Sequence, residues 1–508
     1  MKSEIIDELK KIVGTSSVLT DIEDLHVYSF QGPLGAYQGP RPDAIVKAHS
    51  EEEIHKVIEI AESERIVVIH RDKTMPQMIK SPWIMLDFTS PKDTSSLRAS
   101  LQKEKKPAVS VHEPPMSSLS ALKMALSNRM LHQKCKKCEL ASGAACSGFC
   151  EVAPFFDWNE TWSAKGRTLL IKGFLDGNVK LTKKLVDVIF TCTMCAQCYS
   201  PCTLEQLKID RCIAFARHEI VRKGLLPECF KGLATRISEQ GSPLRMPLQK
   251  RARTWWFSNL AETPKKGGKV LYWIGCLTAY RFPNIGMSVI NLLKKGDVDF
   301  MTLNNDEGCC GLPLYQAGLW VEAKENAIST VEKLKASGAE TLVVSCAGCY
   351  YAFKKVFPEV LGVEIPLKVL HTSQFIERMI KNCDLNFTEL RTRVTYHDPC
   401  DLGRHCGVYE PPRNVIRRIP KVQLVDMNLN RSHERCCGGG GGLWTFNPNL
   451  GRNIAYTLLL EEALSLEVEA IVTACPMCYM NLKYTSRLKK INLQIYDLAE
   501  IVDKGCLA

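Results

Sequence analysis

The sequence predicts an α/β and α protein, in which a helical module is followed by two duplicated α/β domains and preceded by a small α+β domain. Three observations carry this prediction. The first 134 residues contain no cysteine, two dense cysteine groups then lie among amphipathic segments, and the remainder of the chain repeats one cysteine pattern. Within each repeat, short β-rich runs alternate with helical segments, which is typical of α/β folds.

Composition and charge limit the class of protein. A chain of 508 residues is too long for one compact core. Its net charge of +11 is spread through helical patterns, so we expect no nucleic-acid partner. The start lacks the apolar core of a signal peptide, and no window has the length of a membrane span. We therefore expect a cytoplasmic protein, with any membrane association made through a partner subunit, whose 23 cysteines serve metal or redox chemistry.

The first two cysteine groups have the spacing of iron–sulfur ligands. The run from Cys192 to Cys202 follows the C-x2-C-x2-C-x3-C pattern of bacterial 4Fe-4S proteins. The earlier group is looser, and zinc stays an alternative there more than at the second group, because zinc sites normally use two C-x2-C pairs. If the fourth cysteine of each group crosses to the other cluster, the two cubane ligand sets are Cys135, Cys138, Cys146 with Cys202, and Cys192, Cys195, Cys198 with Cys150.

The surroundings of these cysteines indicate the domain boundaries. The segment Glu160–Lys172 and those after it have helical spacing, so residues 126–262 are expected to form a helical two-cluster ferredoxin-like domain. Residues 1–95 are predicted to form a separate small domain. Residues 96–125, which carry Lys, Ser and Pro, are expected to be a linker.

The remaining cysteines form an internal duplication, with matching positions 124 to 129 residues apart. Copy one, residues 263–388, and copy two, residues 389–508, each have a single cysteine, then Cys-Cys-Gly, then C-x2-C. The candidate metal ligands are Cys276, Cys309, Cys310, Cys346 and Cys349 in copy one, and Cys400, Cys436, Cys437, Cys475 and Cys478 in copy two.

Each copy also repeats its predicted elements. Short β-rich runs lead into the single cysteine and into the C-x2-C pair, and helical segments lie between them. The strands are predicted at Lys269–Gly275, Thr341–Ser345, Arg393–Asp398 and Ala470–Ala474, and the helices include Val321–Ser337 and Asn453–Leu466. We expect mainly parallel sheets, with the cysteines at the carboxyl ends of strands and before helix N-termini, where anionic groups are favoured.

Five cysteines per copy are one more than a cubane uses, so one thiolate of the adjacent pair is expected to bridge two irons. The glycines that follow, Gly438–Gly442 in copy two, let the backbone pass close to the metal and donate N–H groups to sulfur.

The pattern in both copies resembles the cysteine-rich CCG-domain proteins typified by heterodisulfide reductase, over residues 126–508. The ferredoxin-like module followed by two CCG domains is similar to the D subunit of that enzyme. The resemblance implies two noncubane 4Fe-4S clusters on the ten cysteines, beside the two 4Fe-4S cubanes. In the family, the mixed disulfide of coenzyme M and coenzyme B is cleaved between the two clusters, which implies catalytic roles for Cys309, Cys310, Cys436 and Cys437.

Two polar residues just before Cys400 are candidates for proton transfer. His397 or Asp398 could protonate a thiolate leaving group, and His405 is similarly placed. The alternative is a polar strand end that hydrogen-bonds to its own turn.

The first 95 residues are similar to the start of the flavin-linked oxidase domain of glycolate and lactate dehydrogenases, through Val18–Phe30, Arg41–Ile54 and Arg65–His70. The Gly-rich loop that holds the FAD pyrophosphate in that domain is replaced by His70–Thr74, which contains no glycine. We therefore predict no FAD in this chain, and a docking domain or a vestige in its place.

The preferred hypothesis is an oxidoreductase subunit that relays electrons through two cubanes to two noncubane clusters, which reduce the coenzyme M–coenzyme B heterodisulfide in methanogenesis. Its expected partners are a small-molecule disulfide and an electron-donor subunit, whether a flavoprotein, a ferredoxin-type protein or a membrane cytochrome b. The alternative is an electron-transfer subunit of a glycolate or lactate dehydrogenase-type complex, which accepts electrons from a separate FAD subunit.

Overall fold

The computed structural model describes residues 1–31, 37–38, 41–70, 83–87, 149–199, 208–244, 268–382 and 385–507. The chain forms two compact units. Among the described residues, the first unit holds 1–87, 149–189, 198–199 and 208–213, and the second holds 190–197 and everything from 214 onward. The predictions for the linker, for His70–Thr74 beyond its first residue, and for Cys135, Cys138, Cys146 and Cys202 lie outside the described residues.

The start of the first unit is a small α/β layer. Its four-stranded sheet has the order β1-β4-β6-β5, in which β4, β5 and β6 are parallel and β1 is antiparallel. Helix α1 buries Ile5, Leu9 and Val13 in the same core as the sheet. The elements are α1 Ser3–Val13, β1 Val18–Leu19, α2 Ile22–Tyr28, β2 Phe30–Gln31, β3 Tyr37–Gln38, β4 Ala44–Lys47, α3 Glu51–Ser63, β5 Val67–His70 and β6 Trp83–Asp87.

The rest of the first unit is helical, with α8 Ala164–Leu175 and α9 Lys183–Phe190. The predicted helix Glu160–Lys172 begins later than expected, because Ser163 caps it by accepting the N–H of Gly166 at 3.1 Å. Helix α2 packs against α8. The buried Asp24 carboxylate of α2 accepts hydrogen bonds from Asn159 at 3.2 Å, Thr161 at 2.6 Å and Lys184 at 2.6 Å. The N-terminal layer is therefore joined to the helices by a buried polar network.

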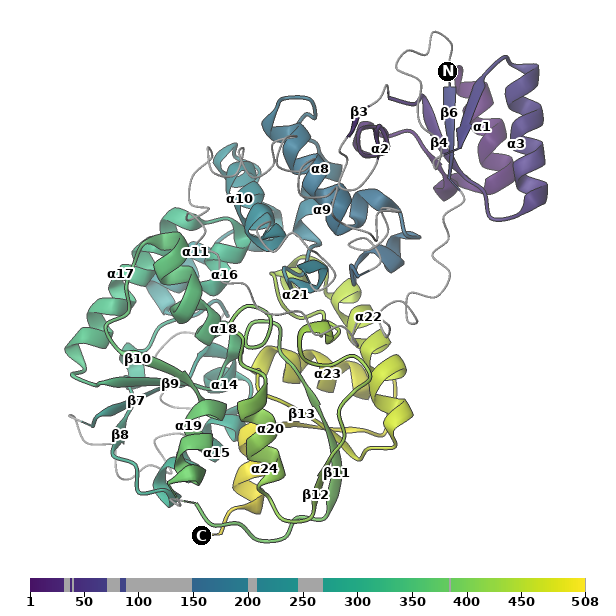
Figure 1. Ribbon diagram of the computed structural model, residues 1–508. Coiled ribbons are helices and arrows are strands. Elements are labelled where there is room, and N and C mark those ends of the chain that lie inside the picture. The colour runs from purple at the N-terminus through teal and green to yellow at the C-terminus, as the bar shows by residue number, and fades with distance from the viewer. Residues whose placement is uncertain are drawn as a thin grey trace. The chain divides into compact units, whose positions relative to one another are not determined.

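The second unit contains two parallel sheets of the same topology (Figure 1). Copy one has the order β10-β9-β7-β8, and copy two has β14-β13-β11-β12, so each strand has an equivalent at the same place. The strands are β7 Val270–Trp273, β8 Phe300–Met301, β9 Thr341–Val344, β10 Lys368–His371, β11 Thr392–His397, β12 Val422–Leu424, β13 Ala470–Thr473 and β14 Gln494–Asp497. The predicted strands and the duplication are confirmed.

Helices surround both sheets. Those before and in copy one are α10 Ile209–Arg222, α11 Leu233–Gln240, α14 Cys276–Tyr280, α15 Pro283–Lys295, α16 Leu312–Ala317, α17 Trp320–Ala336, α18 Ala347–Tyr351 with its π-helical continuation Ala352–Leu361, and α19 Thr372–Lys381. Those in copy two are α20 Glu410–Arg417, α21 Leu443–Phe446, α22 Pro448–Leu458 with its π-helical continuation Leu459–Ala463, α23 Pro476–Leu488 and α24 Leu498–Gly505.

The two copies pack on each other as an approximate two-fold pair. Helix α15 packs against α24, and α19 packs against α20, so the helix that precedes the second strand of one copy meets the last helix of the other. Figure 1 shows these four helices between the two sheets. Because equivalent surfaces face each other, equivalent sites of the two copies can meet near the axis.

Candidate metal centre

The sheets place three of the four cysteines that follow predicted strands as expected. Cys276 begins α14 directly after β7, and Cys346 and Cys475 are the N-cap residues of α18 and α23, directly after β9 and β13. Cys400 differs from the expectation. It follows β11 but enters a turn, and the next helix begins only at Glu410. The expectation that every such cysteine precedes a helix N-terminus is therefore wrong for Cys400.

The Cys-Cys-Gly motif has the same local geometry in both copies. The Gly311 N–H donates to the Cys309 sulfur at 3.4 Å, and the Gly438 N–H donates to the Cys436 sulfur at 3.3 Å. Both glycines have positive φ, 77° and 73°, which residues with a side chain rarely adopt. A Cβ at Gly438 would also lie 2.2 Å from the carbonyl oxygen of Gly451. The motif glycine thus turns its own N–H back toward the first sulfur.

The ten ligand candidates of the two copies form one continuous set of hydrogen-bonded thiols. In copy one the thiols are linked in the order Cys276, Cys309, Cys310, Cys349, Cys346. In copy two they are linked in the order Cys400, Cys436, Cys437, Cys478, Cys475. Cys346 and Cys475, which are equivalent positions, contact each other and join the two sets.

Some of these thiols have a pKa that is lowered by their neighbours. Hydrogen bonds from Cys436 and Cys478 lower the pKa of Cys437 to about 5. Hydrogen bonds from Cys349 and Cys475 lower the pKa of Cys346 to about 6. The thiolate is the form that binds metal.

Four predicted cubane ligands lie within the described residues. In the first unit, Arg167 donates to the Cys150 sulfur at 3.3 Å. In the second unit, the N–H of Met194 donates to the Cys192 sulfur at 3.4 Å. Met194 and Ala196 both have positive φ, 52° and 58°, although neither is glycine. Such strained backbone persists where the surroundings require it, as at ligand sites.

The loop that carries Cys192 and Cys195 lies against copy two. The Cys195 thiol is hydrogen-bonded to Cys436. Gly441 approaches the loop so closely that a Cβ there would lie 2.3 Å from the Thr193 carbonyl oxygen. The additional glycines of copy two therefore have a purpose beyond the motif itself, because they make room for this loop.

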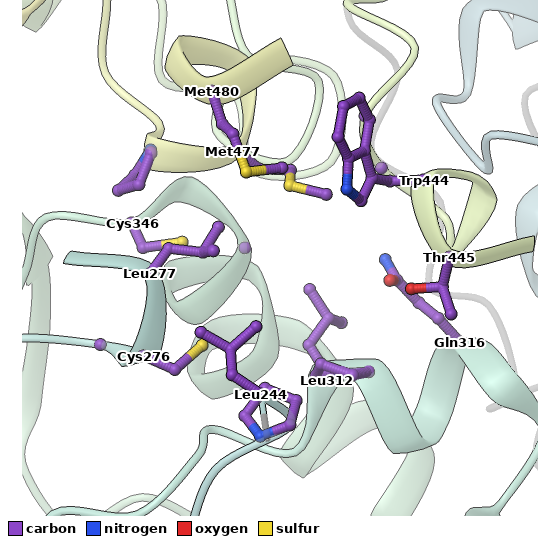
Figure 2. A pocket seen from close by; sticks show the side chains of 18 of the residues that line it. Leu244, Cys276, Leu277, Leu312, Gln316, Cys346, Trp444, Thr445, Met477 and Met480 are labelled. Carbon is purple, nitrogen blue, oxygen red and sulfur yellow. The ribbon is translucent and has the colours of Figure 1, made fainter. Parts of the chain in front are cut away.

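A cavity of about 600 Å³ opens beside the thiols of copy one (Figure 2). Its wall includes apolar side chains such as Leu277, Leu312 and Met477, and the charged side chains of Arg236, Arg281 and Asp401. Of the ten ligand candidates, the cavity is lined by Cys276, Cys310, Cys346 and Cys349 of copy one and by Cys475 of copy two.

The candidate proton donors lie away from this cavity wall. His397 is buried and its Nδ1 pairs with a Glu434 carboxylate oxygen at 2.8 Å, while a ring nitrogen lies within 4.8 Å of the Cys437 and Cys478 sulfurs. Asp398 accepts two hydrogen bonds from the Arg413 guanidinium, both at 2.7 Å. His405 stacks on the ring of Tyr351 at 4.4 Å between centroids. Asp398 is thus an ion-pair anchor for α20.

Sequence reasoning missed three functional neighbours. Glu307 and Glu434 stand two residues before each Cys-Cys pair, a signal that aligning the two copies would have given. Glu307 accepts the N–H groups of Ile274 and Gly275 at 2.9 and 2.8 Å, just before Cys276. Arg404 carries no pattern in the sequence, and only the fold brings it to the cysteines.

The residues present fit anionic iron–sulfur clusters. Nη2 of Arg404 and Nε2 of His397 are buried without a hydrogen-bond partner among the described residues. Buried polar groups are normally paired, so each indicates a missing acceptor or ligand atom next to the thiols.

Within the described ranges, no helix is both long and apolar enough to cross a membrane.

Comparison with known proteins agrees with this geometry. The family model described as "CCG: Cysteine-rich domain" matches residues 270–354 and 394–483. The D subunit of the dihydromethanophenazine:CoB–CoM heterodisulfide reductase of Methanosarcina acetivorans is 33% identical over 320 residues, covering 62% of this chain and 77% of the relative. The probable iron-sulfur-binding oxidoreductase FadF of Bacillus subtilis is 31% identical over 389 residues, covering 73% of this chain and 51% of the relative.

A further relative is the B subunit of the fumarate reductase (CoM/CoB) of Methanothermobacter marburgensis, 27% identical over 317 residues, covering 62% of this chain and 61% of the relative. The duplicated thiol sites and these similarities define an iron–sulfur oxidoreductase. Within that class, the chain belongs to the CCG-domain family that includes the D subunit of heterodisulfide reductase.

Proposed function

We propose that this protein reduces a small-molecule disulfide, and that the substrate is the coenzyme M–coenzyme B heterodisulfide. The observation that carries the proposal is the unbroken set of ten thiols, one end of which opens onto the cavity. The name of the Methanosarcina acetivorans relative, part of a CoB–CoM heterodisulfide reductase, supports the choice of substrate and a place in methanogenesis.

The proposed ligand sets follow the two copies. Cys276, Cys309, Cys310, Cys346 and Cys349 would hold one noncubane cluster, and Cys400, Cys436, Cys437, Cys475 and Cys478 the other. Cys192, Cys195, Cys198 and Cys150 would hold one cubane, and Cys135, Cys138, Cys146 and Cys202, which lie outside the described residues, would hold the other. Such clusters would supply electrons one at a time for a reaction that consumes two.

The overall reaction breaks one S–S bond and takes up two electrons and two protons to give two thiols. The electrons come from an external donor, proposed to be a partner flavoprotein, ferredoxin-type protein or cytochrome. The chain's own residues bind and orient the substrate. Leu277, Leu312 and Met477 exclude water from the cavity beside Cys276 and Cys346, and the guanidinium groups of Arg236 and Arg281 favour an anionic disulfide.

The test is anaerobic oxidation of a reduced viologen dye by the heterodisulfide in protein with its full iron content. We expect two thiols released for every two electrons taken from the dye. Iron-loaded protein that gives no thiol would contradict the proposal.

An alternative function is electron transfer from a separate flavoprotein that oxidises a 2-hydroxy acid. The match to FadF over 389 residues leaves room for it, because the name of that relative gives an iron-sulfur-binding oxidoreductase and no disulfide substrate. Reduction of the iron-loaded chain by such a flavoprotein, together with the absence of thiol release, would support it.

A further inference from the structure

Arg404 lies between copy two and the loop that carries Cys192 and Cys195. It stands in the turn after Cys400, where its Nε donates to the Cys195 carbonyl oxygen at 2.6 Å and its Nη1 donates to the Glu434 carbonyl oxygen at 2.5 Å. One guanidinium therefore holds the main chain on both sides of the contact.

Two neighbouring hydrogen bonds fix the same loop. Gln197 Nε2 donates to the His433 carbonyl oxygen at 2.8 Å, and His405 Nε2 lies 2.9 Å from the Met194 carbonyl oxygen. The loop is thus seated along the segment that leads into Cys436, and its position does not depend on Arg404 alone.

The remaining guanidinium nitrogen of Arg404, Nη2, is buried without a hydrogen-bond partner among the described residues. The thiols of Cys195 and Cys400 both contact Cys436. Burial by itself would lower the pKa of Arg404, but the neighbouring sulfurs of these three residues raise it. A fixed positive charge therefore faces three thiols, two of copy two and one of the loop.

By sequence position, copy one has a tyrosine where copy two has Arg404. The residue four places after its first cysteine is Tyr280, whereas Arg404 stands four places after Cys400. Cys276 and Cys310 of copy one line the cavity, whose wall includes Arg236 and Arg281. The two copies thus differ in where a guanidinium lies: in the cavity wall beside copy one, and against the Cys195 loop in copy two.

We propose that Arg404 is a positioning residue that seats the Cys192–Cys195 loop on copy two and stabilises added negative charge at Cys195, Cys400 and Cys436. A cluster held by these cysteines would gain negative charge on reduction, and a buried guanidinium beside it would favour that state. The site in copy two is then easier to reduce than the same site without the guanidinium. This inference rests on the proposed iron–sulfur function of these cysteines.

The test is a reductive titration of the iron-loaded full chain, followed by electron paramagnetic resonance in the absence of any disulfide. The copy-two signal is identified as the one lost in Cys437→Ser. In Arg404→Gln, we expect its reduced-to-oxidised ratio at a fixed potential to fall about tenfold, which corresponds to 59 mV for one electron. The copy-one signal is expected to stay unchanged.

Two further variants separate charge from structure. Arg404→Lys keeps the charge and should keep the wild-type potential, and the exposed Arg418→Gln removes a charge from the surface of copy two and should shift nothing. An unchanged potential in Arg404→Gln, or an equal shift in Arg404→Lys, overturns the proposal. If Arg404→Gln does not keep its iron, a second neutral variant, Arg404→Met, is titrated instead: a lowered potential supports the role of charge, and an unchanged potential overturns it. Because no disulfide is present, a failed thiol-release assay leaves this result unaffected.

Discussion

Copy one and copy two have the same sheet order and the same five cysteines, yet their surroundings differ. Four of the five candidate ligands of copy one line the cavity, whereas Cys475 is the one candidate ligand of copy two that does. Copy two instead contacts the loop of Cys195 through Cys436 and Arg404. Duplication therefore supplied two equal sets of candidate ligands, and the packing around each set distinguishes an outer set beside the cavity from an inner one.

The two copies also differ in what the glutamate before each Cys-Cys pair holds. In copy one Glu307 holds the backbone that leads into Cys276, and in copy two Glu434 holds His397. The position equivalent to His397 at the end of the first strand is Trp273, which pairs with Val344 as His397 pairs with Thr473. A polar ring beside the sulfurs is thus a feature of copy two.

The largest effect is expected from removing the second cysteine of either motif. Both Cys310→Ser and Cys437→Ser should lower the rate of disulfide reduction more than about 100-fold. This exceeds the usual effect of losing a residue that only hydrogen-bonds to a metal ligand, because the ligand itself is removed. Each variant should lose a different resonance signal and part of its iron. In Cys437→Ser, the remaining copy-one signal should also be reduced more slowly by the dye, as measured by freeze-quench spectroscopy.

The control is Cys212→Ala, since Cys212 is buried in α10 and the pKa of its thiol is raised by burial and by Asp210 rather than by another thiol. It should keep its iron and turn over within about twofold of the wild type. Equal reduction rates of the copy-one signal in wild type and Cys437→Ser would remove the distinction between inner and outer sites.

An intermediate effect is expected in the glycine loop of copy two. Gly441 has φ of 61°, and its substitution by alanine would push a Cβ against the Thr193 carbonyl oxygen. We expect Gly441→Ala to lower the free energy of unfolding by about 3 kcal/mol, from left-handed strain and overpacking together. The midpoint of urea unfolding of the iron-loaded protein measures this.

Gly440→Ala is the matched control, because its nearest atom, the Thr193 carbonyl oxygen, would lie 3.7 Å from the new Cβ, an ordinary contact. Its cost should stay below about 0.5 kcal/mol. Similar losses in the two variants would show that the close approach of the loop is not what requires glycine.

The smallest effect concerns the last helix of each copy. His371 and Asp497 both end the fourth strand and cap the following helix, accepting N–H groups of Ser373 at 3.1 Å and Ala499 at 2.9 Å. Burial lowers the pKa of His371 to about 4 and raises the pKa of Asp497 well above its usual range. Both caps are therefore favoured in their neutral forms.

The two caps should give opposite pH dependences. Between pH 6.5 and about 4 the unfolded chain binds a proton at His371 that the folded chain does not, so this contribution to stability is lost as the pH falls. Above pH 3.8 the folded chain keeps the Asp497 proton, so stability falls as the pH rises.

The free energy of unfolding of His371→Asn, relative to the wild type, should therefore be about 1 kcal/mol higher at pH 5.5 than at pH 7.5. For Asp497→Asn the same difference from the wild type should be higher at pH 7.5 than at pH 5.5. Urea unfolding at the two pH values measures both. Asparagine keeps the cap in both variants. Changes that are the same at both pH values would exclude this difference between the copies.

The repeat made much of this architecture predictable. Strands such as Thr341–Val344 and Ala470–Thr473 agree with the predicted runs to within a residue, because β-rich residues are followed at once by cysteine. Helix ends were less predictable. The helix predicted to start at Asn453 begins at Pro448, where the Asn447 side chain caps it by accepting the N–H of Leu450.

The neighbours of the sites were beyond sequence reasoning. Arg404 reaches Cys195 across 209 positions of the chain, and no local pattern indicates such a contact. The cavity likewise depends on how copy one meets copy two, so the unequal exposure of Cys276 and Cys400 could not be predicted from two matching motifs.

The unbroken line of thiols has a consequence for how the protein matures. Neighbours such as Cys346 and Cys475 are held in contact, and Cys346 is already a thiolate near neutral pH because its pKa is about 6. Thiolates react readily once an oxidant has converted a neighbouring thiol, and the product is a disulfide. We therefore expect an iron-free chain exposed to air to form a disulfide between its two copies, which iron bound at these cysteines would prevent.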